Sequence, residues 1–322
     1  MKKSMKSFGT AAVALGAIVA AQSASAEGRT FAIVTAGLSS SYQTAMAKQF
    51  TDVVEAAGDT VVVIDAQFNP ELQANAIDDL IQQGVAGVGI QPLDSVAGMG
   101  WVDRLNEAGI PVVAGGSIIG EFDEAPTYVY PGLTALVVTD DIEVGRLSGK
   151  LAADNLPKDK TVKIGVVSGM AGNPVVEHRL NGFKKGLEEN GIKYEIVVNQ
   201  PTTWTPEDGQ ALCQDYVTAY PDIDMIYSEA PPMTVGCARA LAAVSSPVKL
   251  ISTAGGQIDE NNEIEDGNVF GTVCTFPGTQ GKIMAEILVA AAADPNYGRG
   301  HFATYDIFPV TKENVGDCVA QW

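Results

Sequence analysis

The sequence lacks the short motifs on which most nucleotide-dependent and hydrolytic enzymes depend. A G-x-G-x-x-G dinucleotide fingerprint is missing, since the nearest match, GVGIQP from Gly87, fails at its last position. There is also no G-x-x-x-x-G-K-[ST] phosphate loop and no G-x-S-x-G nucleophile elbow, because Ser117 lies in GGSII and Ser168 in VVSGM. These absences favour a binding protein without a cofactor over an enzyme.

Zinc ligands in a useful arrangement are missing as well. The two histidines, His178 and His301, lie far in sequence from the cysteines, and no pair of cysteines has C-x-x-C spacing. We therefore predict no metal site. In an oxidising compartment, disulfides are the better interpretation of the cysteines. All four lie in the carboxyl-terminal half: Cys213, Cys237, Cys274 and Cys318.

Positive charge is scarce. The chain has 20 lysines and arginines against 39 aspartates and glutamates, a formal net charge of -19. Nucleic acid is excluded as a partner, because binding it requires clustered positive charge. Such acidity promotes solubility but identifies no ligand.

The amino terminus has the pattern of a secretory signal peptide. Lys2, Lys3 and Lys6 precede an apolar run over residues 8–21, and Ala24-Ser25-Ala26 has the small-x-small form of a cleavage site. The apolar run is shorter than the roughly 20 residues of a spanning helix. We predict cleavage after residue 26, which removes three lysines and leaves 296 residues with a charge of -22. The expected location is the periplasm.

After the leader, short β-rich runs alternate with longer helical patterns, which is typical of βαβ units. FAIVTAG (31–37) precedes a helix expected from about residue 41 to 57, ending before Gly58. TVVVIDA (60–66) is followed by Asn69 and Pro70, a capping residue and the proline favoured at the first helical position.

This order of elements recurs further along the chain, which indicates an internal duplication. The offset between the two copies drifts slowly, as small loop insertions would cause. The matches are FAIVTAG ending at Gly37 with KIGVVSG ending at Gly169 (offset 132), Pro70-Glu71 with Pro206-Glu207 (136), and Ala114–Gly116 with Ala254–Gly256 (140). We predict an α/β fold with two doubly wound parallel-sheet lobes.

The two Ala-Gly-Gly strand exits should lie on opposite walls of a cleft between the lobes, where small ligands bind. Two interpretations of these glycines remain open. They serve a turn that needs positive φ, or they leave room for a ligand to approach the backbone.

Longer segments carry a family resemblance. DAQFNPELQANAIDDLIQQGVAGVGIQP (65–92), AGIPVV (108–113) and GMAGNPVVEHRLNGF (169–183) resemble type I periplasmic binding proteins, in the ribose-binding-like group that serves ABC importers. The resemblance covers nearly the whole mature chain. It implies lobes of residues 27–139 plus 276–306 and 140–275 plus 307–322, joined by three crossovers near Asp140, Thr275 and Ile307.

The resemblance also implies ligand contacts at matching positions. In the first lobe these are the loop Ser39 to Gln43, with Ser41, Tyr42 and Gln43, then Asn69, Gly116 and Ser117; in the second they are Glu177, Trp204, Ala230, Ala254 and Thr275. Further candidates at strand ends are Gln67, Gln91, Glu229 and Gln257. Asn69 caps its own helix, with or without an additional ligand contact.

The charged groups that usually clamp a sugar in this family are absent here. Gly116-Ser117 replaces an Asp-Arg pair, Glu177 stands near a usual arginine, Ala230 replaces asparagine and Ala254 replaces aspartate. The aromatic platforms Tyr42 and Trp204 survive. Glu177 and Glu229 add negative charge with no obvious arginine opposite, which would suit a polyol or an amine better than an acid.

The predicted function is capture of a small, neutral, hydroxylated solute, a sugar or polyol, for the membrane permease of an ABC importer. The alternatives are a receptor for a small amine or other non-sugar metabolite or signal, and a sensor subunit presenting ligand to a membrane receptor. The protein is expected to be monomeric.

The resemblance orders the three possible disulfide pairings. It places two cysteines on consecutive helices of one lobe, and the other two where a crossover begins and where the tail returns. The favoured pairing is Cys213 with Cys237 and Cys274 with Cys318.

Overall fold

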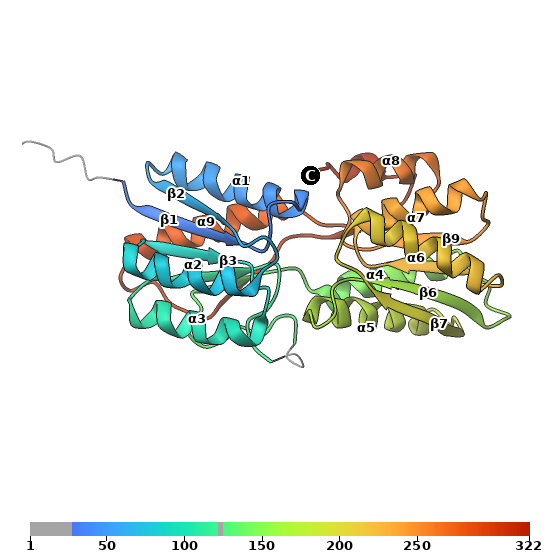
Figure 1. Ribbon diagram of the computed structural model, residues 1–322, viewed down its shortest axis with the longest axis horizontal. Helices are drawn as coiled ribbons and strands as arrows, with labels where there is room; N and C mark the ends of the chain where they lie inside the picture. Colours follow the sequence, from blue (N-terminus) through green and yellow to red (C-terminus); the bar gives the residue numbers. More distant parts are fainter. Residues whose placement is uncertain (1–27, 122–124) are drawn as a thin grey trace, which may run out of the picture.

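The computed structural model describes residues 28–121 and 125–322 of the chain, so the predicted signal peptide lies outside the described residues. Two α/β lobes lie side by side along the long axis of the molecule (Figure 1). This is the predicted fold class. In the described part of the chain, no helix combines the length and apolarity needed to span a bilayer.

The first lobe is built on a six-stranded parallel sheet in the order β11-β5-β4-β3-β1-β2. Its strands are β1 (Thr30–Thr35), β2 (Thr60–Asp65), β3 (Gly87–Ile90), β4 (Val112–Gly115), β5 (Ala135–Val137) and β11 (His301–Ala303). Its helices are α1 (Ser41–Ala56), α2 (Pro70–Gln83), α3 (Ser95–Glu107) and α9 (Pro277–Ala293).

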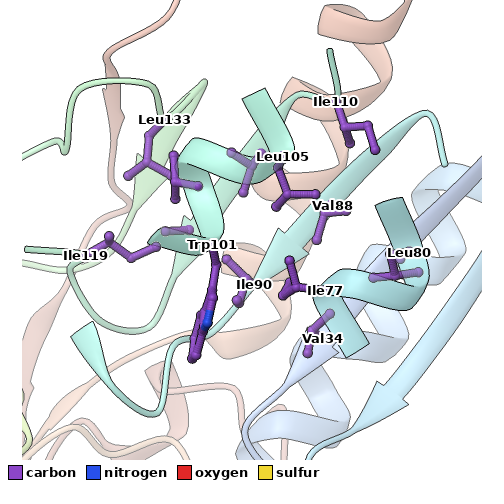
Figure 2. Packing of buried hydrophobic residues seen from close by; sticks show 14 of the residues in the cluster. Val34, Ile77, Leu80, Val88, Ile90, Trp101, Leu105, Ile110, Ile119 and Leu133 are labelled. Carbon is purple, nitrogen blue, oxygen red and sulfur yellow. The ribbon is translucent and has the colours of Figure 1, made fainter. Parts of the chain in front are cut away.

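Each face of this sheet has its own apolar core. One core contains residues of α1 and α9, and the other contains residues of α2 and α3. Figure 2 shows the second core, where Ile77 of α2 and Leu105 of α3 approach Val88 of β3. Trp101 of α3 packs there too and is 5% exposed. The strands are therefore covered on both faces, as a parallel sheet requires.

The second lobe repeats the plan with a four-stranded parallel sheet in the order β7-β6-β8-β9 and a small antiparallel pair, β10 with β12. The strands are β6 (Val162–Ser168), β7 (Tyr194–Pro201), β8 (Met225–Ser228), β9 (Lys249–Ser252), β10 (Thr272–Cys274) and β12 (Phe308–Val310). The helices are α4 (Asp141–Ala153), α5 (Pro174–Glu189), α6 (Pro206–Ala219), α7 (Pro231–Ala243), α8 (Ile258–Asp266) and a 3-10 turn, η1 (Val315–Asp317).

Helix starts follow the sequence signals. Asn69 accepts hydrogen bonds from the backbone N–H groups of Glu71 and Leu72, and Pro70 is the first residue of α2. In the second lobe Thr205 caps α6 in the same way, ahead of Pro206. The matching helices of the two lobes thus begin at the positions that the offset of 136 relates.

The chain passes between the two lobes three times, from β5 to α4, from β10 to α9 and from β11 to β12 (Figure 1). The crossovers predicted near Asp140, Thr275 and Ile307 fall within these connections. The predicted residue boundaries of the two lobes, 27–139 plus 276–306 and 140–275 plus 307–322, remain a proposal.

Two disulfides are present, and they have the favoured pairing. Cys213 of α6 is joined to Cys237 of α7, and Cys274 at the end of β10 is joined to Cys318. The first bond links two helices within the second lobe, whereas the second fixes the start of the tail to a strand beside the crossover into α9.

Candidate functional site

A cavity of about 460 Å³ lies between the lobes, within the size range of small-molecule sites. The carboxyl ends of strands and the first turns of helices from both lobes form its walls. Its lining includes Ser39 to Gln43, Phe68, Gln91 and Gly116 of the first lobe; Met170, Asn173, Arg179, Thr203 to Glu207, Ala230 to Pro232, Arg239, Ala254, Gln257 and Asp259 of the second; and Trp322.

Many of the predicted contact positions meet in this cleft. Those that line it are Ser41, Tyr42, Gln43, Gln91, Gly116, Trp204, Ala230, Ala254 and Gln257. They come from distant parts of the sequence, and parallel strands bring them together because their carboxyl ends share one edge of each sheet. Their contact with a solute stays a prediction.

Other predicted positions lie outside the lining. The side-chain oxygen of Asn69 is used by the start of α2, and the Thr275 hydroxyl donates to the Gly255 carbonyl at 2.9 Å. Ser117 is buried beside a much smaller pocket that Asp141 also lines. Glu177 is exposed on α5.

Glu229 also lies outside the lining. It is fully buried, and its Oε2 accepts a hydrogen bond from the Gly169 N–H at 3.0 Å. The remaining strand-end candidate, Gln67, is exposed at the end of β2 and does not line the cleft either.

Two aromatic rings stand at corresponding places in the two lobes. Phe68 and Trp204 both line the cleft, and both have positive φ, 55° and 65°. The ring of Phe68 covers Gly37 and the ring of Trp204 covers Gly169, so closely that a Cβ on either glycine would overlap the ring. Phe68 was not predicted, although the offset of 136 that relates Pro70 to Pro206 also relates Phe68 to Trp204.

Tyr42 lies where the cleft meets the crossovers. Its hydroxyl donates to Oε1 of Gln280 in α9 at 2.7 Å, and burial raises the pKa of this phenol to about 12. Its ring and that of Trp322 are perpendicular, with 5.3 Å between ring centroids and planes at 89°. Part of the predicted platform is therefore already in contact with a second aromatic side chain.

An arginine does lie near Glu229, although its ion pair is with Asp141 and its hydrogen bond to Glu229 goes to the backbone. Arg179 lines the cleft, its Nη1 donates to the Glu229 carbonyl at 2.9 Å, and its Nε donates to Asp141 at 2.8 Å. The Asp141 carboxyl is 6% exposed and the Arg179 side chain 13%. Burial raises the pKa of Asp141, and the neighbouring Arg179 charge partly offsets this.

At the first-lobe strand exit, the glycine serves a turn that needs positive φ, whereas close approach of a ligand to its backbone stays a prediction. Gly116 has a φ of 74° and also lines the cleft. A Cβ at this position would lie 2.6 Å from Nε2 of Gln91. In the second lobe, Gly256 has a φ of 105°, and a Cβ there would lie 2.6 Å from the Thr275 carbonyl oxygen. Glycine is thus needed for the turn and for close packing at both exits.

Two buried glutamates should make the stability of the second lobe depend on pH. Burial raises the pKa of Glu229 and that of Glu260 to about 8. Glu260 is fully buried in α8, and the hydroxyls of Ser252 and Thr272 partly offset the effect of burial. Both carboxyls therefore hold protons in the folded protein at pH values where an unfolded chain has released them.

We expect these two groups to lower the free energy of unfolding as the pH rises from 4.5 to about 8. The stability linked to each proton is complete below the unfolded pKa and is lost as the pH passes through the folded pKa. Glu260→Gln should reduce this loss by about 1.4 kcal/mol per pH unit. Urea unfolding across this pH range measures the slope.

Glu265→Gln, which removes an exposed carboxylate from the same helix, is the matched control. A Glu260→Gln protein whose stability varies with pH as steeply as that of the wild type would contradict the assignment.

Comparisons with known proteins agree with this architecture. A model of the periplasmic binding protein domain matches residues 31–296. The ribose import binding protein RbsB of Salmonella typhimurium (strain LT2) is 25% identical over 287 residues, which cover 88% of this chain and 91% of that protein.

Solved structures match the fold over most of their length. The crystal structure of a galactofuranose binding protein aligns with a TM-score of 0.81 at 19% identity, covering 90% of this chain and 97% of the other. An ABC transporter solute binding protein from Bacillus halodurans C-125 with bound myo-inositol has a TM-score of 0.80 at 22% identity, covering 92% and 99%.

Proposed function

Because this chain belongs to the periplasmic binding protein domain family, we propose that it captures a small, neutral, hydroxylated solute, a sugar or polyol, in the cleft between its lobes. The family is one of binding proteins, and we assign the chain no catalytic role. The solute would pass to the membrane permease of an ABC importer. The protein would act as a monomer in the periplasm after loss of residues 1–26.

The observation that carries this proposal is the pair of aromatic rings at repeat-related positions of one cleft, Phe68 and Trp204. Aromatic faces pack well against the apolar faces of sugar and cyclitol rings, while amides bind their hydroxyls. Gln43, Gln91 and Gln257 supply amide groups around the same cavity. The names of the relatives, which refer to ribose, galactofuranose and myo-inositol, point to the same solute class.

The charged side chains in the cleft are few and nearly balanced. Arg179 and Arg239 line it together with Glu207 and Asp259, two positive against two negative side chains. Asp141, which pairs with Arg179, adds one further carboxylate beside the lining. This small excess of negative charge suits a neutral solute and makes an amine the alternative that the screen must test.

A screen of sugars, polyols and amines by thermal shift, followed by calorimetric titration, tests the proposal. The panel contains myo-inositol, the amine putrescine, and three pentose and hexose pairs that differ by one hydroxymethyl group: D-ribose with D-allose, D-xylose with D-glucose, and L-arabinose with D-galactose. Binding of a sugar or polyol is the expected result. Binding of putrescine alone would overturn the assignment of a neutral solute.

We also expect the protein to become more compact when it is saturated with a solute from this panel. The lobes are joined by three connections with the cleft between them, so closing around a solute would bring their walls together. Small-angle scattering with and without the solute measures the radius of gyration. An unchanged radius at saturation would contradict a receptor that closes.

A further inference from the structure

The tail from Cys318 to Trp322 runs between the two lobes, and Figure 1 places the end of the chain between α1 and α8. Its first residue is fixed to the second lobe by the disulfide to Cys274 and by a hydrogen bond of 2.9 Å from Asn261 Nδ2 to the Cys318 carbonyl. The tail therefore leaves a rigid point of the second lobe.

The residues that follow are held by both lobes. On the second-lobe side, the Gln321 N–H donates to the Gly256 carbonyl at 3.3 Å, and the Ile258 N–H donates to the Trp322 carbonyl at 2.9 Å. On the first-lobe side, Oε1 of Gln321 accepts from the N–H of Gly278 in α9 at 2.8 Å. These contacts fix the backbone on both sides of the Trp322 side chain's attachment point.

The indole of Trp322 occupies the wall of the cleft. It lines the cavity, its ring meets Tyr42 of the first lobe edge to face, and a Cβ built on Gly256 would lie 3.6 Å from its Nε1. The Nε1 atom is buried and has no hydrogen-bond partner among the described residues. The ring is thus set between the strand exit of one lobe and the first helix of the other.

We propose that Trp322 is a solute-contacting and specificity-determining residue, delivered to the cleft by the disulfide-anchored tail. This inference rests on the proposed function. It adds a side chain from the carboxyl-terminal tail to the cleft lining, which otherwise comes from the two lobes. A bulky indole beside Tyr42 limits the volume at the crossover end of the cavity. It should therefore contribute contact area to any bound ring and restrict substituents that point toward it.

Calorimetric titration tests this inference. The ligands are the pentose and hexose of the panel pair that binds with the highest affinity, and the protein carries no added residues after Trp322. Trp322→Ala should raise both dissociation constants by about tenfold or more, as for a buried aromatic anchor. The increase should be larger for the pentose, because the hydroxymethyl group of the hexose can enter the space left by the indole. Trp322→Phe should give the same trend with smaller changes.

Val319→Ala is the control in the tail, since that side chain is 69% exposed. Unchanged affinity of Trp322→Ala for both sugars would overturn the inference. Equal losses for pentose and hexose would also overturn it, because a tail that only holds the lobes together would affect both alike. A wild type that binds no sugar or polyol would instead overturn the proposed function, and this inference with it.

The two disulfides provide a second, matched comparison. Replacing Cys274 and Cys318 by serine frees the tail, and replacing Cys213 and Cys237 by serine removes a bond of the same lobe without freeing it. We expect only the first double variant to reproduce the unequal affinity losses of Trp322→Ala. Equal effects of the two double variants on affinity would contradict the role of the tail.

Discussion

Replacing Trp204 by alanine should raise the dissociation constant for a bound sugar about tenfold to hundredfold, or more. The indole lines the cleft and stands on Gly169, so its position is fixed before a solute arrives. Its removal takes away an aromatic contact worth roughly 1 to 3 kcal/mol. Calorimetric titration with the best sugar of the panel measures the change.

Two further variants separate lost contact from lost stability. Trp101→Phe changes the apolar core of the first lobe, away from the cleft, and should lower stability while leaving affinity unchanged. Phe68→Ala removes the ring at the matching place on the opposite wall and should weaken binding as Trp204→Ala does. A Trp204→Ala protein that binds with wild-type affinity would remove this ring from the site.

The duplication made much of the cleft predictable. Strand exits and helix starts recur at slowly drifting offsets, so the duplication placed Gly116 and Ala254 on facing walls, and the family resemblance added Trp204. Phe68 was within reach of the same reasoning, because its partner Trp204 had been identified. It was overlooked because a single aromatic residue beside Asn69 gives no local signal of its positive φ.

Arg179 was missed for a geometric reason. The resemblance drew attention to Glu177, but residues two positions apart on a helix point to nearly opposite sides. On α5 this places Glu177 toward solvent and Arg179 toward Asp141 and Glu229.

Trp322 could not be placed from the sequence. It has no counterpart in the duplication, and its position depends on which cysteine pairs with Cys318 and on how the tail crosses to α9. Spacing alone allows three pairings of four cysteines. The contacts of a tail are long-range, and no periodic pattern encodes them.

Removing one partner of the buried pair Arg179 and Asp141 should cost more stability than breaking any other ion pair of the described residues. Both side chains are nearly inaccessible, and the guanidinium also donates to the Glu229 carbonyl. Arg179→Met keeps an unbranched apolar stem but leaves a buried carboxylate and a carbonyl without their partner. We expect the free energy of unfolding to fall by about 3 to 5 kcal/mol at neutral pH.

Arg146→Met is the matched control, because Arg146 also pairs with carboxylates, Glu143 and Glu189, but on a half-exposed helix surface. Exposed pairs contribute about 0 to 1 kcal/mol, so this variant should remain close to the wild type in urea unfolding. The Arg179→Met defect should also shrink as the pH falls, because burial already raises the pKa of Asp141 and loss of the neighbouring charge raises it further. Once Asp141 is protonated, no buried charge remains uncompensated. Two outcomes would contradict this prediction. One is an equal fall in the free energy of unfolding for the two arginine variants, and the other is an Arg179→Met defect that does not change with pH.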